Sequence, residues 1–76
     1  MPHIIVKIAA GRTEREKTDL AEALANLAAE KLAIDPETIS VAIEDVQREN
    51  WVDDVYKPEI LARMDSIYKK PGYNPL

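Results

Sequence analysis

Two short β-branched segments separated by one long amphipathic segment constrain the fold of this chain more than any other feature. The first segment, residues 1–8, contains Ile4, Ile5, Val6 and Ile8, and β-branched side chains suit a pleated, largely buried surface. The second segment, residues 39–46, alternates apolar with small or polar side chains, which is the period of a strand. Each segment therefore predicts a β-strand.

The segment between them, residues 13–33, has the pattern of an amphipathic helix. Thr13 and Glu16 form a capping box, which is typical of a helix start. Apolar side chains then recur at steps of three and four along one face: Leu20, Ala23, Leu24, Leu27 and Ala28. The triplet at 35–37, Asp-Pro-Glu, ends the helix and makes a turn.

A strand, a helix and a strand in 46 residues predict a β-α-β unit of the α/β (α+β) class. The two strands should be parallel and their crossover right-handed. Two strands and one helix form too small a sheet to be stable alone, and a chain of 76 residues, expected to be a single domain (1–76), has a marginal core. The chain has no cysteine for a disulfide and only one histidine for a structural metal site. We therefore expect self-association to complete the sheet.

The last third of the chain predicts a second helix. Residues 47–50 are polar and irregular, and Trp51 follows them. Residues 52–69 are expected to be helical, with Pro58 near the first turn or at a kink. An apolar face follows at helical spacing: Ile60, Leu61, Met64 and Ile67. The run 69–73, Lys-Lys-Pro-Gly-Tyr, is a helix end.

Composition excludes several classes of function. A formal charge of −4 argues against a nucleic-acid partner, which usually needs a basic face. No apolar run approaches ~20 residues, so we expect no membrane partner. The N-terminus lacks the pattern of a secretory signal, and a cytoplasmic location is expected. No phosphate loop, metal cluster or Ser/His/Asp set is present in the sequence, so we expect no metal site.

Pro2 admits two interpretations. Proline is well tolerated at the first residue of a strand, where its missing N–H costs little. If Met1 is removed, however, Pro2 becomes an N-terminal secondary amine in an apolar setting. An unperturbed α-amino group has a pKa of about 7.7–8.0, so modest desolvation or a nearby cation makes it a base near pH 7.

Arg12, Trp51 and His3 also have structural and functional interpretations. Arg12 is either a solvated loop residue or a ligand for a substrate carboxylate, which a guanidinium binds with paired N–H donors. Trp51 either packs in a core or interface, or forms a pocket wall that excludes water. His3 is interpreted as a hydrogen-bonded structural residue.

These residues resemble those of the 4-oxalocrotonate tautomerase family. The resemblance covers most of the chain and is carried by Met1-Pro2-His3-Ile4, by Gly11-Arg12 before a helix, by the strand 39–46 and by Asn50-Trp51. The ending at 69–73 is similar to that of the short, dimeric PptA-like branch. The resemblance implies a β-α-β tautomerase fold with parallel strands, a long helix and a C-terminal helix, assembled into dimers or hexamers and acting without a cofactor.

The resemblance also implies roles for four residues. Pro2 matches the catalytic amine, which shuttles a proton between oxygen and carbon of an enol and its keto form. Arg12 matches an arginine that binds the substrate carboxylate or carbonyl, and Trp51 matches an aromatic position that lines the pocket. Ser40 is a departure, because hexameric members carry a second arginine there that stabilises the enolate oxygen.

The resulting hypothesis is an isomerase, a keto–enol tautomerase for a small 2-hydroxy or 2-keto acid such as phenylenolpyruvate. The C-terminal helix favours a homodimer over a hexamer. Hydration or dehalogenation of an unsaturated acid, with a protonated proline as the acid, is the first alternative. The second is a catalytically inactive oligomeric binding domain, which a retained Met1 would favour because Pro2 would then be acylated.

Overall fold

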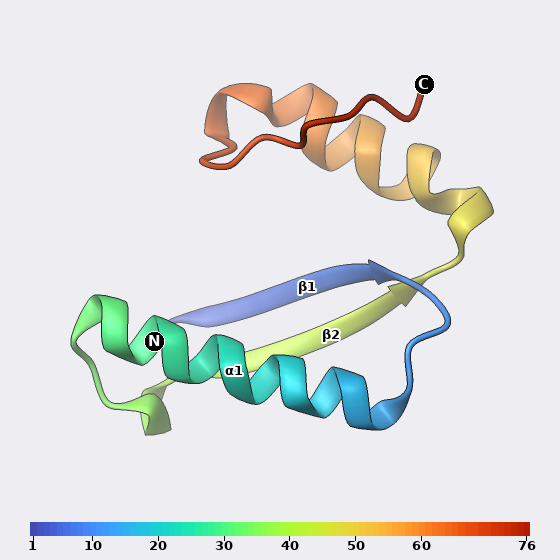
Figure 1. Ribbon diagram of the computed structural model, residues 1–76. Helices are drawn as coiled ribbons and strands as arrows, with labels where there is room; N and C mark the ends of the chain where they lie inside the picture. The colour runs from blue at the N-terminus through green and yellow to red at the C-terminus, as the bar shows by residue number, and fades with distance from the viewer.

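The computed structural model describes all 76 residues and is built on a β-α-β unit (Figure 1). Strand β1 (His3–Ala9) is followed by helix α1 (Glu14–Leu32) and strand β2 (Ser40–Val46). The two strands are parallel, in a register that places His3 beside Ser40 and Ala9 beside Val46. The predicted parallel β-α-β arrangement is confirmed, with strand boundaries shifted by one or two residues.

Helix α1 begins and ends at local signals in the sequence. The Thr13 hydroxyl accepts a hydrogen bond from the Glu16 N–H at 3.0 Å, and the Glu16 carboxylate accepts one from the Thr13 N–H at 3.0 Å. The predicted capping box is therefore present. Ala33 caps the other end in the left-handed conformation (φ 55°). A short 3₁₀ turn, η1 (Pro36–Thr38), then leads into β2.

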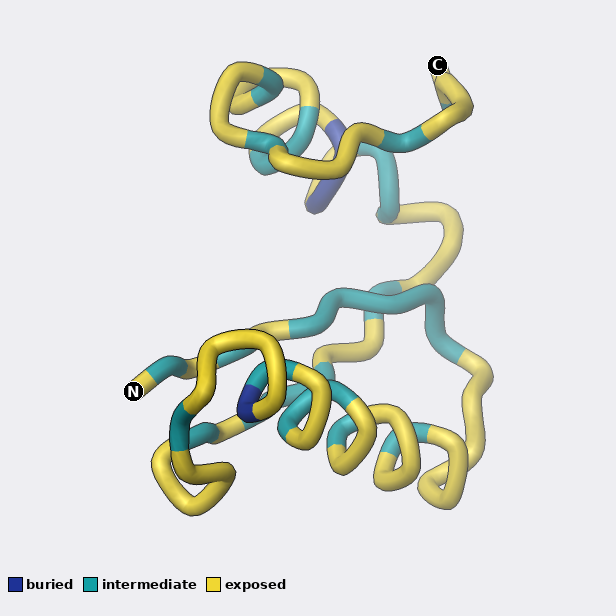
Figure 2. The backbone as a smooth tube through the Cα atoms, turned by 60° about the vertical axis from the view of Figure 1, so that its left-hand side comes forward, coloured by how far each residue is buried: buried dark blue, intermediate teal, exposed yellow.

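The two faces of the sheet differ in cover. Helix α1 lies across one face, as the Lys17–Asp45 ion pair at 3.0 Å and the ribbon of Figure 1 show. The opposite face carries Ile5, whose exposed fraction is 53%. Three residues of the whole chain are buried, Ala29 in α1 and Val55 with Tyr56 further on (Figure 2). The chain alone therefore has no continuous core.

The segment after β2 differs from the prediction. We expected one helix over 52–69, but the structure has a 3₁₀ turn, η2 (Arg48–Asn50), a π-helical segment, η3 (Val52–Ile60), and a 3₁₀ segment, η4 (Leu61–Ser66). Proline has no N–H to donate and its ring crowds the carbonyl four residues earlier, so regular α-helix cannot continue through Pro58. The expected C-terminal helix is confirmed over residues 52–66 and ends before residue 69, while the break in helical backbone geometry lies at Arg63 (φ −124°, ψ 28°) rather than at Pro58.

Residues 52–76, which we call the C-terminal arm, lie on the side of the sheet away from α1 (Figures 1 and 2). An ion pair between Lys7 of β1 and Glu59 of η3 joins the arm to the sheet. None of the helices combines the length with the apolar character that a membrane-spanning segment requires.

Candidate active site

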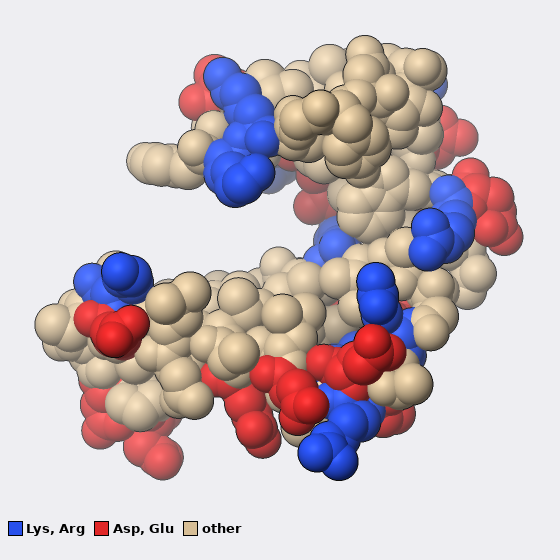
Figure 3. All heavy atoms as spheres, in the orientation of Figure 1, with Lys and Arg blue, Asp and Glu red and all other residues tan.

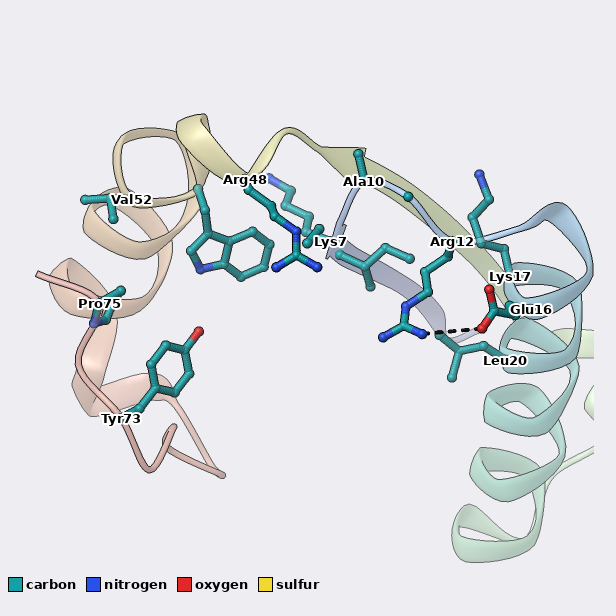
Figure 4. A pocket seen from close by; sticks show the side chains of 14 residues that line it. Lys7, Ala10, Arg12, Glu16, Lys17, Leu20, Arg48, Val52, Tyr73 and Pro75 are labelled. Atoms are coloured by element: carbon teal, nitrogen blue, oxygen red, sulfur yellow. Dashed lines mark hydrogen bonds and ion pairs between the residues drawn. The ribbon is translucent and has the colours of Figure 1, made fainter.

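A cavity of about 1110 Å³ lies where the two strands end, between the sheet and the C-terminal arm. Its lining comes from the end of β1 and the loop after it (residues 7–12), from the first turns of α1, from η2 and the start of η3, and from the tail of the chain. Figure 4 shows the labelled side chains surrounding this space. Half of the lining residues are hydrophobic, which is usual for small-molecule sites.

The strand register explains why Arg12 and Trp51 both line this cavity. Because β1 and β2 are parallel, their carboxyl ends meet at one edge of the sheet. The Ala10 N–H extends the pairing by donating to the Val46 carbonyl at 2.8 Å. Gly11 then turns the chain with φ of 121°, which glycine adopts without strain. Two residues predicted to act together are thus brought to one cavity.

Arg12 is oriented by the cap of α1. Its Nη1 donates to the Glu16 carboxylate at 3.3 Å, while the other oxygen of that carboxylate accepts the Thr13 N–H. These contacts lower the pKa of Glu16, first through the Thr13 backbone hydrogen bond and then through Arg12. About two thirds of the Arg12 side chain stays exposed, so its remaining N–H donors are open to an anion.

Trp51 is half-buried, and its indole nitrogen is fully buried without a hydrogen-bond partner. An unpaired buried donor costs about 1–3 kcal/mol, and such groups in native structures usually have an explanation.

Two lysines of the lining are already paired. Lys7 binds Glu59, and that hydrogen bond raises the pKa of the Lys7 ammonium. Lys17 contacts Glu14 and Asp45, each at 3.0 Å, and these two hydrogen bonds raise the pKa of Lys17. Both lysines are therefore held by carboxylates rather than free for a ligand.

The sequence analysis assigned no site role to Arg48 or Tyr73, although both line the cavity. The Arg48 guanidinium and the Tyr73 hydroxyl point into the same space as Arg12 (Figure 4). A signal for Arg48 was available: it follows β2 by two residues, just as Arg12 follows β1 by three. For Tyr73 no local signal exists, because its place depends on how the arm folds back.

Pro2 and Ser40 lie at the other end of the sheet. The Ser40 N–H donates to the Pro2 carbonyl at 3.2 Å, and the Ser40 hydroxyl is hydrogen-bonded to His3 Nδ1 at 2.6 Å. A seven-residue strand spans roughly 20 Å at ~3.3 Å per residue. The four predicted site residues thus form two pairs that a single chain keeps apart, and neither Pro2 nor Ser40 lines the cavity.

The Pro2 nitrogen is an amide in the chain that retains Met1. The Met1 ammonium donates to the carbonyl of Thr38, the last residue of η1, at 2.9 Å. No group of three or more His, Asp and Glu side chains is placed to hold a metal ion. What the cavity offers chemically is positive charge beside apolar walls, which suits a small organic anion.

The family model described as tautomerase enzyme matches residues 2–57. A probable tautomerase of Xylella fastidiosa is 45% identical over 76 residues, which cover 100% of this chain and 93% of that protein. Tautomerase PptA of Pectobacterium atrosepticum is 40% identical over 75 residues, covering 97% of this chain and 99% of that protein.

Solved structures show the same fold. TomN, described as a 4-oxalocrotonate tautomerase homologue of the tomaymycin biosynthetic pathway, matches with a TM-score of 0.64 and 36% identity over 66% of this chain and 77% of that one. A structure from a study of trans-3-chloroacrylic acid dehalogenase activity matches with a TM-score of 0.61 and 28% identity, over 64% of this chain and 92% of that one.

Proposed function

This chain belongs to the tautomerase family and is an enzyme of the isomerase class, and from that premise we propose that it interconverts the enol and keto forms of a small 2-hydroxy or 2-keto acid such as phenylenolpyruvate. The base is the amine of Pro2, and no cofactor takes part. The observation that carries the proposal is the cavity that holds Arg12 and Trp51 together at the carboxyl ends of the strands.

The site is assembled from two chains. Pro2 lies just before the amino end of β1 and Arg12 just beyond its carboxyl end, and the seven-residue strand between them spans roughly 20 Å at ~3.3 Å per residue. A two-fold axis that sets the sheets of two copies antiparallel places the Pro2 end of one copy beside the Arg12 end of the other. The uncovered face and free edges of the sheet support such pairing.

Each residue then has a distinct task. Once Met1 is removed, the Pro2 amine takes the proton from the enol hydroxyl and returns it to carbon. Arg12 binds the substrate carboxylate through paired N–H donors, and the cations of the cavity lower the pKa of the amine beside them. Trp51 shields the reacting atoms from water. Ser40 lies beside Pro2, to whose carbonyl its N–H donates, and adds no charge to that end of the sheet.

A second candidate is addition of water to an unsaturated acid, or dehalogenation of one. The likeness to a structure from a study of trans-3-chloroacrylic acid dehalogenase activity favours it. In that chemistry a protonated proline acts as an acid, so the amine must titrate high, whereas a base must titrate low. An NMR titration of the Pro2 nitrogen in the chain without Met1 separates the two candidates.

Blocking the amine tests the proposal directly. Protein without Met1 should convert an aryl enolpyruvate to its keto form, followed by ultraviolet absorbance. An added N-terminal residue that acylates Pro2 should lower kcat/KM by about 10²–10⁴-fold, the usual contribution of a general base. Pro2→Ala keeps an amine but loses the ring that fixes it, and should also be slower. Equal rates for these three proteins would sink the proposal.

A further inference from the structure

The cavity is basic although the chain is acidic. The formal charge of the chain is −4, yet four cationic side chains line the cavity against one acidic one. A cleft lined by one sign of charge concentrates ions of the other sign. Of the four cations, the two lysines and Arg12 have carboxylate partners within the chain.

Arg48 has no carboxylate partner. It makes no ion pair anywhere in the structure, and its side chain is exposed toward the cavity, where it faces the same space as Arg12 (Figure 4). The strand register fixes this convergence, because Ala9 and Val46 are neighbours and the two arginines follow them by three and two residues. Arg48 thus lacks a carboxylate partner in a cavity that three other cationic side chains also line. This arrangement indicates that Arg48 binds an anionic group of a ligand.

Ketonisation creates such a group. When the enol hydroxyl loses its proton to the amine, its oxygen becomes negatively charged; when the ammonium returns that proton to the neighbouring carbon, a C–H bond forms and the carbonyl is restored. The substrate carboxylate is charged throughout, but the enolate oxygen is charged only during the reaction. A donor aimed at that oxygen therefore raises kcat rather than lowering KM.

We propose that Arg48 is the residue that stabilises the enolate oxygen, while Arg12 holds the carboxylate. The assignment rests on the proposed tautomerase function. It follows from position, because Arg12 is engaged with the helix cap through Glu16, whereas Arg48 keeps all its N–H donors for the ligand. Ser40 cannot take this role, since its hydroxyl is neutral and is hydrogen-bonded to His3.

The test compares Arg48→Ala, Arg48→Lys and Arg15→Ala, all without Met1, for ketonisation of phenylenolpyruvate. Arg15 is a matched control on α1, with 88% of its side chain exposed and Asp19 as its partner. Arg48→Ala should lower kcat by about 10²-fold or more, as loss of an oxyanion donor does elsewhere, with KM changed less than about threefold. Arg48→Lys should restore part of the rate as a point charge, and Arg15→Ala should match the wild type.

Two further measurements keep the outcomes distinct. Thermal unfolding of each variant separates a loss of fold from a loss of rate, and Arg48 is exposed enough to be replaced without disturbing a core. Quenching of Trp51 fluorescence by phenylpyruvate measures binding of the product acid. A raised KM and weaker quenching with unchanged kcat would overturn the assignment and give Arg48 a carboxylate-binding role. Unchanged kinetics would overturn it too.

Failure of this inference differs from failure of the proposed function. If wild type without Met1 is active and acylation of Pro2 abolishes the activity, the tautomerase function stands whatever Arg48 does. If acylation has no effect, the proposed function fails first, and the role of Arg48 in enolate stabilisation fails with it.

Discussion

At the scale of single residues, one carboxylate links the fold to the site. Glu16 closes the N-terminus of α1 by accepting the Thr13 N–H, and its second oxygen accepts from Arg12. The residue that caps the helix thereby also sets the direction of the arginine that we propose as the carboxylate ligand. Removing the charge of Glu16 while keeping the cap separates these two effects.

Glu16→Gln should flatten the decline of stability at acid pH. The pKa of Glu16 is lowered in the folded chain, so its ionised form stabilises the fold above the usual glutamate range and this contribution is lost as pH falls through the lowered pKa. Glutamine still accepts the Thr13 N–H in a capping box but does not titrate. Thermal unfolding from pH 6 to pH 2.5, at fixed protein concentration, measures the difference.

Glu22→Gln is the control for that series. Glu22 is an exposed carboxylate of the same helix and makes no ion pair. Its removal should leave the shape of the pH profile unchanged. Profiles of the same steepness for Glu16→Gln and wild type would contradict the assigned role.

At the scale of elements, the C-terminal arm is the least constrained part of the fold. Residues 58–76 lie beyond the match to the family model, and η3 and η4 are π-helical and 3₁₀ rather than α-helical. The arm nevertheless supplies Val52, Tyr73 and Pro75 to the cavity. The position of the arm relative to the sheet therefore matters for the site, and the Lys7–Glu59 ion pair is a contact that joins η3 to β1.

Glu59→Gln should loosen the arm without unfolding α1. The charged hydrogen bond to Lys7 is lost, and with it the ion pair that joins η3 to β1. Amide hydrogen exchange should become faster in residues 52–66 and stay unchanged in α1. Asp53→Asn removes a pair with Lys57 that lies within the arm, at 3.7 Å, and should not have this effect. Equal rates of amide hydrogen exchange in the two variants would contradict the role of the Lys7–Glu59 ion pair in holding the arm.

At the scale of the whole molecule, the chain alone is too open for a stable domain. Its radius of gyration is 13.9 Å, whereas a compact chain of 76 residues has about 11 Å. Figure 3 shows a hollow between the sheet and the arm whose sheet side consists mostly of uncharged atoms, and the uncovered sheet face exposes Ile5. A second copy that packs on this face would bury it and complete the site proposed above, and the arm makes a dimer the expected assembly.

Ile5→Glu should dissociate that assembly. A carboxylate at the centre of the uncovered face would be buried without a partner on association. Analytical ultracentrifugation should give a dimer for the wild type and monomer for the variant, with loss of tautomerase activity. Leu27→Glu, an apolar residue of α1 with 51% exposure, is the matched control and should stay dimeric. A hexamer of the wild type would refute the expected dimer.

Local patterns in the sequence were sufficient for most of the β-α-β unit. The capping box at Thr13 and Glu16 and the β-branched strands act over a few residues, so their structure follows from neighbours in the chain. The segment after Trp51 was harder to predict, because apolar spacing at 60, 61, 64 and 67 suggests one helix whereas Pro58 breaks its hydrogen bonding. The identity of the helix type there depends on packing within the arm.

The sequence by itself determined the parallel strands, the capped helix and the residues that carry the family resemblance, since these depend on side-chain type and short spacing. The tertiary structure decided which of those residues meet. Strand direction and register bring Arg12, Arg48 and Trp51 to one cavity and hold Pro2 and Ser40 at the far end of β1. The two groups are separated because an extended strand lies between them. The proposed reaction therefore needs a second chain to bring Pro2 to the cavity.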